Sequence, residues 1–368
     1  MKIKEIRVFV VSNDLSGKVW NPKIRWRVKH SVLVEVATEE GLTGLGECWC
    51  FDLAPDALAA FIASEVRPRI LGADALDPVA IAHRLNDTTT LSARHGIMAS
   101  ALSGIDIALW DIAARVKAVP LWRLLGGKAP RVPVYASGGL YGENKTLDDL
   151  AAELTGYIDQ GFDHVKMKVG ALKAAEDEAR VRAVRKALGP GPKLTIDGVY
   201  SFDASAAQAF HARVADCGIA TFQAPLPAAD LDGMAALVAA GVPIMGLEAE
   251  YQIPVIRALI ERPAVATLQF ALVACGGISA GRHIAAMAAE ADVPCSLEVS
   301  STAVAQMAAF HFAAAHPQVA SVEVHMVHRM LFEHFPFPPD AIRDGRLTLP
   351  ERPGLGIELP PGQCRQLA

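Results

Sequence analysis

Short strand-like runs recur about every 25 residues along the second part of this chain, and this spacing limits the possible folds more than any other feature. Each run is bounded by Gly or Pro and carries or ends near a polar residue. A strand, a helix and two loops take about this length, so the series predicts βα units and a parallel sheet. About eight such units close a (β/α)8 barrel, which catalyses at the C-terminal ends of its strands. The residues at these ends are Lys168, Asp197, Gln223, Glu248, Ala271, Glu298 and Glu323.

Two lysines, Lys166 and Lys168, lie two positions apart, so a strand would point both amines to one face. Neighbouring cations repel, and this repulsion together with burial lowers the pKa of an amine toward neutrality. A lysine in that state can remove a proton as a general base. On the spacing alone, two solvated lysines on a surface strand remain the simpler interpretation.

Length and composition agree with a barrel and a second domain. The 368 residues exceed the ~250 of a single barrel, and 52% are apolar, which supports a large core. A net charge of −5 without a basic run gives no reason to expect nucleic acid or an anionic membrane as a partner. No uninterrupted apolar segment approaches the ~18 residues of a membrane span, and the N-terminus does not resemble a secretory signal. We therefore predict a cytoplasmic protein.

The six cysteines are scattered, and only Cys48 and Cys50 lie close together. These two alternate like strand residues, and no second Cys or His cluster accompanies them. The pattern favours free thiols over disulfides or a zinc site.

The first part of the chain has a different pattern. Residues 2–12 and 26–48 alternate like antiparallel strands, whereas residues 54–69, 78–87 and 95–118 have the period of helices. We therefore expect an N-terminal α+β capping domain over residues 1–125 and a (β/α) barrel over residues 126–335, with its first strand near residues 134–137. A C-terminal segment, residues 336–368, begins with the proline-rich residues 336–339 and is expected to pack back on the cap.

Five motifs occur in an order typical of one known family: SGIDIALWD at residues 103–111, LLGG at 124–127, Lys166-Met167-Lys168, CGGI at 275–278 and PGLGI at 353–357. On these motifs the chain resembles the enolase superfamily, in particular its mandelate racemase and muconate lactonizing branches, over nearly its whole length. The resemblance implies an enolase-type TIM barrel with an N-terminal α+β capping domain. It implies less about the reaction, because one fold hosts many activities.

The resemblance also implies a shared first step. A divalent metal, usually magnesium, binds the substrate carboxylate, a base takes the α-proton, and the cation holds the resulting enediolate. Magnesium prefers hard oxygen ligands, which carboxylates at strand ends provide. The positions that match the three family ligands are Asp197, Gln223 and Glu248.

The middle ligand position departs from the family pattern, because Gln223 stands where Glu is usual. An amide oxygen can still coordinate a metal, but the site loses one negative charge, so we expect weaker magnesium binding. Glu250 shares a strand face with Glu248 and could be a substitute ligand, unless the strand has ended and Glu250 belongs to a loop or helix start. For Asp197 and Glu248 the alternative role is to cap the following helices.

The opposite side of the expected site departs from the family as well. The racemase branch has an Asp-His dyad on the sixth and seventh strands, and the lactonizing branch has a lysine on the sixth. Here these positions are Ala271 and Glu298, which argues against a two-base racemase that uses the dyad. Lys168 remains the base candidate, with Lys166 lowering its pKa and contacting the substrate carboxylate. Glu298 could deliver a proton to a departing β-hydroxyl if apolar neighbours raise its pKa, or it could cap the next helix.

Glu323 matches a position that, in the racemase branch, hydrogen-bonds the substrate carboxylate. His325 and His328 lie near it in the sequence, so a purely structural role for Glu323 is also open.

Three functions are compatible with these residues. The first is a metal-dependent lyase, a dehydratase that acts on a hydroxy or sugar acid, and one-base chemistry favours it. The second is an isomerase, cycloisomerase or epimerase of the same superfamily, which returns a proton to carbon. The third is a carboxylate-binding protein with a degraded metal site and no turnover, for which Gln223 and Ala271 are the support.

The substrate is expected to be a small carboxylate that the cap helps to select. The candidate binding residues are Trp20 and Lys23, in a polar loop expected over residues 12–24, and Trp49, in the stretch that runs to Asp52. Lys23, Arg25 and Arg27 could meet a second anionic group or could be solvated cations of a strand. The resemblance further suggests a homo-oligomer.

Overall fold

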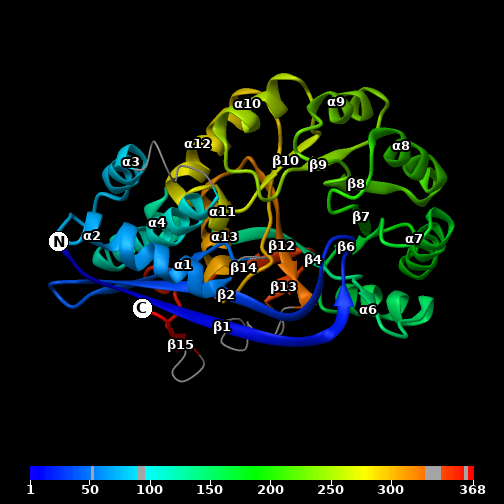
Figure 1. Ribbon diagram of the computed structural model, residues 1–368. Coiled ribbons are helices and arrows are strands. Elements are labelled where there is room, and N and C mark those ends of the chain that lie inside the picture. Colours follow the sequence, from blue (N-terminus) through cyan, green and yellow to red (C-terminus); the bar gives the residue numbers. More distant parts are fainter. Residues whose placement is uncertain (51–53, 89–95, 328–340, 360–363) are drawn as a thin grey trace.

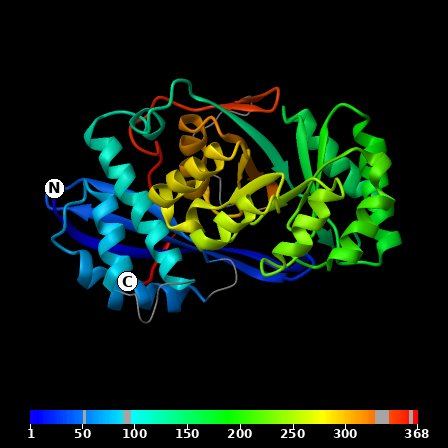
Figure 2. The same cartoon turned by 90° about the horizontal axis from the view of Figure 1, so that it is seen from above.

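The computed structural model describes residues 1–368 except 51–53, 89–95, 328–340 and 360–363 (Figure 1). Asp52, His328 and the proline-rich residues 336–339, which are named above, lie outside the described residues. The rest of the chain forms a barrel and a cap that lies against one side of it (Figure 2).

Eight parallel strands form the barrel, and the first and last of them pair to close it. Every strand pairs in parallel with its neighbours, and a helical segment separates most consecutive strands in the sequence. The predicted (β/α)8 fold with an N-terminal cap is therefore confirmed. The barrel strands are β4 (Arg131–Ser137), β6 (His164–Lys168), β7 (Lys193–Asp197), β8 (Ile219–Gln223), β9 (Ile244–Gly246), β10 (Thr267–Phe270), β11 (Cys295–Leu297) and β12 (Val319–His325).

The barrel helices cover the outside of the strands (Figure 1). Their buried faces are apolar, as expected for helices that pack on a parallel sheet. They are α6 (Leu147–Asp159), α7 (Ala174–Leu188), α8 (Ala204–Arg213), α9 (Leu231–Ala239), α10 (Ile253–Glu261), α11 (Leu272–Cys275), α12 (Gly277–Glu290) and α13 (Ala303–Ala315). A short 3-10 turn, Ala215–Cys217, follows α8.

The cap is built on an antiparallel sheet with helices on one face. Its strands β1 (Ile3–Trp20), β2 (Arg25–Thr38) and β3 (Thr43–Cys48) form a meander. The cap helices are α1 (Pro55–Phe61), which continues through the π-helical turn Ile62–Val66 into α2 (Arg67–Ile70), α3 (Pro78–Thr88), α4 (Ile97–Val116) and the short α5 (Leu121–Leu124). No disulfide links any of the six cysteines, all of which lie within the described residues.

Helix α4 is the central element that joins cap and barrel. By length and composition alone it could cross a membrane, but 78% of its apolar window is buried inside the protein. It packs on β3 on one side and on α11 and α12 on the other. At Gly277, which has a φ of +86°, an added Cβ would lie 2.4 Å from Oδ2 of Asp106, so a glycine is needed at this contact between the barrel and α4. The CGGI motif thus marks this contact.

The prediction of a loop over residues 12–24 is wrong for most of that range. Strand β1 continues to Trp20 and pairs with β2 as a two-stranded ribbon that extends beyond the cap, where Val19 pairs with Trp26. The ribbon reaches the barrel, because Trp20 also pairs with Tyr141 of β5 (Tyr141–Gly142). Only residues 21–24 form the turn, in which Oδ1 of Asn21 accepts hydrogen bonds from two backbone amides. Most residues of the ribbon are partly exposed, so its sequence lacks the apolar alternation that identifies a strand.

The C-terminal segment contacts both parts of the molecule. Strand β14 (Arg346–Thr348) pairs with β4 and with β13 (Ile342–Arg343), whereas β15 (Arg365–Gln366) pairs with β1 of the cap. Between them, Asp111 of α4 accepts hydrogen bonds from the backbone amides of Leu45 and Leu355 at 3.0 and 2.7 Å. It also pairs with Arg115 at 3.0 Å. One buried carboxylate therefore ties α4 to β3 and to the C-terminal segment.

We expect Asp111→Ala to lower the free energy of unfolding by about 3 kcal/mol or more, because it leaves buried amides and a guanidinium without their acceptor. Urea denaturation measures this loss. The matched control is Glu358→Ala, which removes the other partner of Arg115, a carboxylate that is 76% exposed. That control should cost less than about 1 kcal/mol, and equal effects of the two variants would contradict the assignment.

Candidate functional site

A cavity of about 340 Å³ lies at the C-terminal ends of the barrel strands, beneath the cap. Side chains from the barrel and from β2 of the cap line it together. Its walls combine ionisable groups of the barrel ends, among them Lys166, Lys168, Glu248, Glu298 and Glu323, with aromatic and polar groups. The lining residues include Asn21, Lys23, Ile24, Trp26, Trp49, Lys166, Lys168, Val199, Tyr200, Gln223, Glu248, Ala249, Glu298, Ser300, Glu323 and His325.

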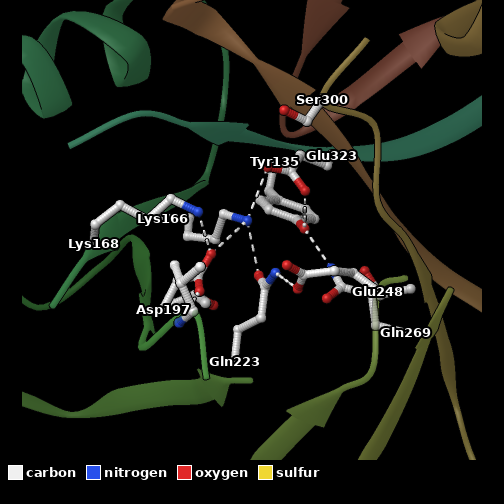
Figure 3. A network of polar contacts seen from close by, with 12 residues as sticks. Tyr135, Lys166, Lys168, Asp197, Gln223, Glu248, Gln269, Ser300 and Glu323 are labelled. Carbon is white, nitrogen blue, oxygen red and sulfur yellow. Dashed lines mark hydrogen bonds and ion pairs between the residues drawn. The ribbon is translucent and has the colours of Figure 1, made fainter. Parts of the chain in front are cut away.

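Strand β6 places both lysines in this cavity, as its period of two predicts. Val165 and Met167 are fully buried on the other face of the strand. Nζ of Lys166 lies 3.1 Å from Oδ2 of Asp197, and Lys168 forms an ion pair with the same oxygen (Figure 3). The two amines therefore share an anion, which the sequence argument about mutual repulsion did not include.

Lys166 is a buried cation with a complete set of partners. Besides Asp197, it contacts Oε1 of Glu323 at 2.8 Å and donates to Oε1 of Gln223 at 2.8 Å. Burial alone would lower the pKa of Lys166, but Glu323, Tyr135 and Asp197 raise it well above its usual value. Lys166 therefore keeps its proton and acts as a fixed positive charge at the barrel mouth, the end of the barrel where the C-terminal ends of the strands lie.

Asp197, the last residue of β7, is an ionised carboxylate. Burial would raise its pKa, yet the two lysines lower it. Its Oδ1 accepts a hydrogen bond from the backbone amide of Val199 at 3.0 Å. It does not cap α8, which Asp203 caps instead.

Gln223 and Glu248 form a connected pair beside Asp197. Nε2 of Gln223 donates to Oε2 of Glu248 at 2.6 Å, while its Oε1 faces Lys166 (Figure 3). Burial and the charge of Asp197 raise the pKa of Glu248 to about 7. Glu250 points elsewhere, since its Oε1 accepts from the backbone amides of residues 251 and 252 before α10. Its contacts are those of a helix start.

The donor set Asp197, Gln223 and Glu248 fits a divalent cation by ligand type. All three side chains offer hard oxygens: Gln223 contacts Glu248 directly, and Lys166 contacts both Gln223 and Asp197. The described residues contain no cluster of three His, Cys, Asp or Glu side chains that could hold a metal, which is consistent with glutamine at the middle position. The set thus has the right atoms and one negative charge less than three carboxylates.

Glu323 belongs to a buried network that joins the barrel strands β4, β10 and β12. The hydroxyl of Tyr135 donates to its Oε2 at 3.3 Å, and Nε2 of Gln269 donates to the Tyr135 oxygen at 3.1 Å (Figure 3). Burial and Glu323 raise the pKa of Tyr135 well above its usual value, so the phenol stays protonated. Neither Tyr135 nor Gln269 was singled out from the sequence, because buried polar residues inside a strand resemble ordinary core positions.

Glu298 follows β11 and is 5% exposed. Its Oε2 has no hydrogen-bond partner among the residues that the structure describes. Burial, Glu323 and Glu248 raise its pKa well above the usual value, whereas Lys29 and Lys166 oppose the shift. Glu298 does not cap α13, because the hydroxyl of Thr302 accepts from the backbone amide of Val304. A protonated carboxyl group therefore faces the cavity.

Lys29 and Tyr200 are residues of the site that sequence reasoning missed. Lys29 of β2 is 1% exposed and donates to Oγ of Ser300 at 2.7 Å. It lies in phase with Lys23, Arg25 and Arg27, so alternation along β2 could have identified it. Tyr200 lines the cavity within a turn that sequence pattern does not define.

The three expected substrate-binding residues have different positions. Lys23 and Trp49 line the cavity. Trp20 is absent from its described lining and instead stacks on Tyr141, with ring centroids 6.2 Å apart. Ala271 is buried at the N-cap of α11 and supplies no acid or base.

Comparisons with known proteins agree with this geometry. Residues 149–362 match enolase C-terminal domain-like proteins, and residues 26–126 match the mandelate racemase / muconate lactonizing enzyme N-terminal domain. An arabinonate dehydratase of Saccharolobus solfataricus is 31% identical and aligns over 90% of this chain and 88% of its own length. A D-galactarolactone cycloisomerase of Agrobacterium fabrum is 30% identical over 98% of this chain and 97% of its own. A racemase of Streptomyces coelicolor A3(2), solved with bound magnesium, is 26% identical with a TM-score of 0.87 and covers 97% of each chain.

We expect Gln223→Glu to tighten magnesium binding at least about tenfold, because a third carboxylate adds negative charge to the same set of oxygens. Isothermal titration calorimetry of the folded variant measures this change without a substrate. Gln223→Asn is the matched control, since it keeps the amide and should show no such gain. An unchanged affinity of Gln223→Glu would place residue 223 outside the metal's ligands.

Proposed function

The chain belongs to the enolase superfamily, in its mandelate racemase and muconate lactonizing branch, and we propose that it is a dehydratase of a hydroxy or sugar acid. Its substrate carries a carboxylate, an α-hydrogen and a β-hydroxyl group. The reaction removes one molecule of water across the α and β carbons. Three groups of this chain carry the chemistry: Lys168, Lys166 and Glu298.

Lys168 is the base that takes the α-proton. It lines the cavity at the end of β6 and is 7% exposed, so a substrate can reach its amine. The neighbouring Lys166 is held as a cation by its buried partners and cannot take this role in its protonated state. Two lysines on one strand face thus have separate roles, one as base and one as fixed charge.

Lys166 lines the cavity, and its ammonium group, already held by three partners, provides a fixed positive charge that attracts the substrate carboxylate and stabilises the negative charge that develops when the α-proton leaves. A divalent cation held by Asp197, Gln223 and Glu248 would add positive charge at that carboxylate. Tyr135 and Glu323 hold Lys166 in place from the other side. Trp26 and Trp49 border the cavity and help to exclude water from it.

Glu298 is the acid that assists loss of the hydroxyl group. When the α-carbon gives its proton to Lys168, the electron pair of that bond first moves onto the substrate carboxylate, and in a second step it forms a double bond between the α- and β-carbons. The bond between the β-carbon and its oxygen breaks, and the proton of Glu298 completes the departing water. A sugar acid then forms an enol that becomes a 2-keto acid. Transfer of one proton from Lys168 to Glu298 through solvent restores both groups.

The observation that carries this proposal is that Oε2 of Glu298, in the same cavity as Lys168, has no hydrogen-bond partner within the described part of the chain. A buried carboxyl with a raised pKa can donate a proton near neutral pH, as an acid in dehydration must. The arabinonate dehydratase relative supports the same class of reaction.

An isomerase or cycloisomerase is the second candidate. The match to a D-galactarolactone cycloisomerase, which extends over 98% of this chain, favours it. In that reaction Lys168 would have the same role, and Glu298 would return its proton without release of water. The product therefore separates the two functions, because only the dehydratase forms a 2-keto acid from an open-chain sugar acid.

We expect Lys168→Ala and Glu298→Gln to fail at different steps. With magnesium in deuterated water and a panel of sugar and hydroxy acids, the wild type should exchange the α-hydrogen and release a dehydrated product. Lys168→Ala should lose both activities by at least about 100-fold. Glu298→Gln should keep α-exchange and lose dehydration by a similar factor. Proton NMR follows both changes in one sample.

Lys193→Ala is the matched control, since this exposed lysine lies at the opposite, N-terminal end of the neighbouring strand β7. It should leave both rates unchanged. Retained exchange in Lys168→Ala would remove Lys168 as the base. Absence of exchange in the wild type over a broad panel, with no magnesium bound in calorimetry, would favour a carboxylate-binding protein without turnover.

A further inference from the structure

The loop that follows β11, residues 298–302, is held by the cap from two sides. Lys29 of β2 donates to the backbone carbonyl of Ser300 and, at 2.7 Å, to its hydroxyl. Glu47 of β3 accepts from the backbone amide of Thr302 at 3.1 Å and from its hydroxyl at 2.6 Å. Both cap side chains are fully buried. The position of this catalytic loop therefore depends on the cap as well as on the barrel.

The ammonium group of Lys29 lies among carboxylates from three elements. Glu298 after β11, Glu47 of β3 and Glu323 of β12 all attract it, and Lys168 of β6 is the nearby cation. Burial lowers the pKa of Lys29 to about 7, although these carboxylates oppose the shift. Lys29 itself is absent from the described lining of the cavity, so it influences a substrate through its neighbours.

Glu298 in turn faces ionisable groups of both signs. The carboxylates of Glu323 and Glu248 favour its protonated form, whereas Lys29 and Lys166 favour its ionised form. Lys29, which comes from the cap, lowers the pKa of Glu298 more than Lys166 does. Lys166 is already engaged with three barrel residues. The titratable groups that face Glu298 or line the same cavity are Lys23, Lys29, Lys166, Lys168, Tyr135, Tyr200, Glu248, Glu323 and His325.

We propose that Lys29 is a positioning residue for Glu298: it fixes the loop that carries the carboxyl group and provides positive charge beside it. Through this contact the cap sets the pH range in which Glu298 holds a proton that it can transfer. The inference rests on the proposed dehydration, in which Glu298 is the acid. It assigns the cap a part in proton transfer in addition to its part in enclosing the substrate.

The test is an infrared pH titration of the Glu298 carboxyl group, and it needs no substrate. The C=O band of protonated Glu298 is isolated by subtracting the spectrum of the same protein with Glu298→Gln. Lys29→Met removes the charge and keeps a long side chain, so the titration midpoint should rise by about 1 pH unit or more, because a lost cation disfavours the carboxylate. Lys29→Arg keeps the charge, and its midpoint should equal that of the wild type or lie below it.

A role in packing alone would not produce this order of midpoints. Equal midpoints in folded Lys29→Met and Lys29→Arg would overturn the proposal, as would a higher midpoint in Lys29→Arg than in the wild type. If Lys29→Met does not fold, Lys29→Gln takes its place with the same expected rise. In the dehydration assay, the loss of activity at high pH should move upward in Lys29→Met by the same amount.

The two proposals can fail separately. If the midpoints follow the expected order but no acid undergoes α-exchange, the proposed function is wrong and the link between Lys29 and Glu298 stands. If dehydration occurs but the midpoints do not change, Lys29 has no influence on the proton of Glu298 and the proposed function stands.

Discussion

A buried ammonium group, that of Lys166, is the interaction around which the barrel mouth is arranged. A charge that is removed from water must be matched by opposite charge and hydrogen bonds, or its cost exceeds any gain. Lys166 meets this requirement with Asp197, Gln223 and Glu323, which come from β7, β8 and β12. Since β6 supplies Lys166 itself, one side chain fixes the relative positions of four strand ends. Lys168, on the same face of β6, lies at the cavity wall, where a substrate can reach its amine.

The cap contributes side chains that hold part of the site in position. Strands β2 and β3 bring Lys29 and Glu47 to the loop after β11, and that loop carries Glu298, the proposed acid. Helix α4 transmits the position of these strands to the barrel, through Asp111 toward β3 and through Asp106 toward α12. Cap and barrel thus act as one unit, and the acid and the base of the reaction depend on different parts of it.

Much of this fold could be predicted from the sequence, because the spacing of the strand-like runs and the motifs around Asp106, Lys166 and Gly277 reflect strong constraints on packing. The positions of Asp197, Gln223, Glu248 and Glu298 at strand ends follow from the same spacing. The ribbon at residues 12–20 could not be predicted, since strands without a buried face carry no periodic signal. Contacts between distant segments, such as Lys29 with Ser300, also leave no local pattern. The partners that raise the pKa of Lys166 come from other strands of the barrel, so the direction of that shift needed the structure.

The most direct test of the central claim is a crystal structure of Glu298→Gln with magnesium and a sugar acid that the wild type dehydrates. The account predicts that Nζ of Lys168 lies within about 3.5 Å of the α-carbon and that the amide of residue 298 contacts the β-hydroxyl. The substrate carboxylate should lie on the cavity side of Lys166 and of the oxygens of Asp197, Gln223 and Glu248. A bound acid whose α-carbon lies away from Lys168, or whose β-hydroxyl points away from residue 298, would contradict the account.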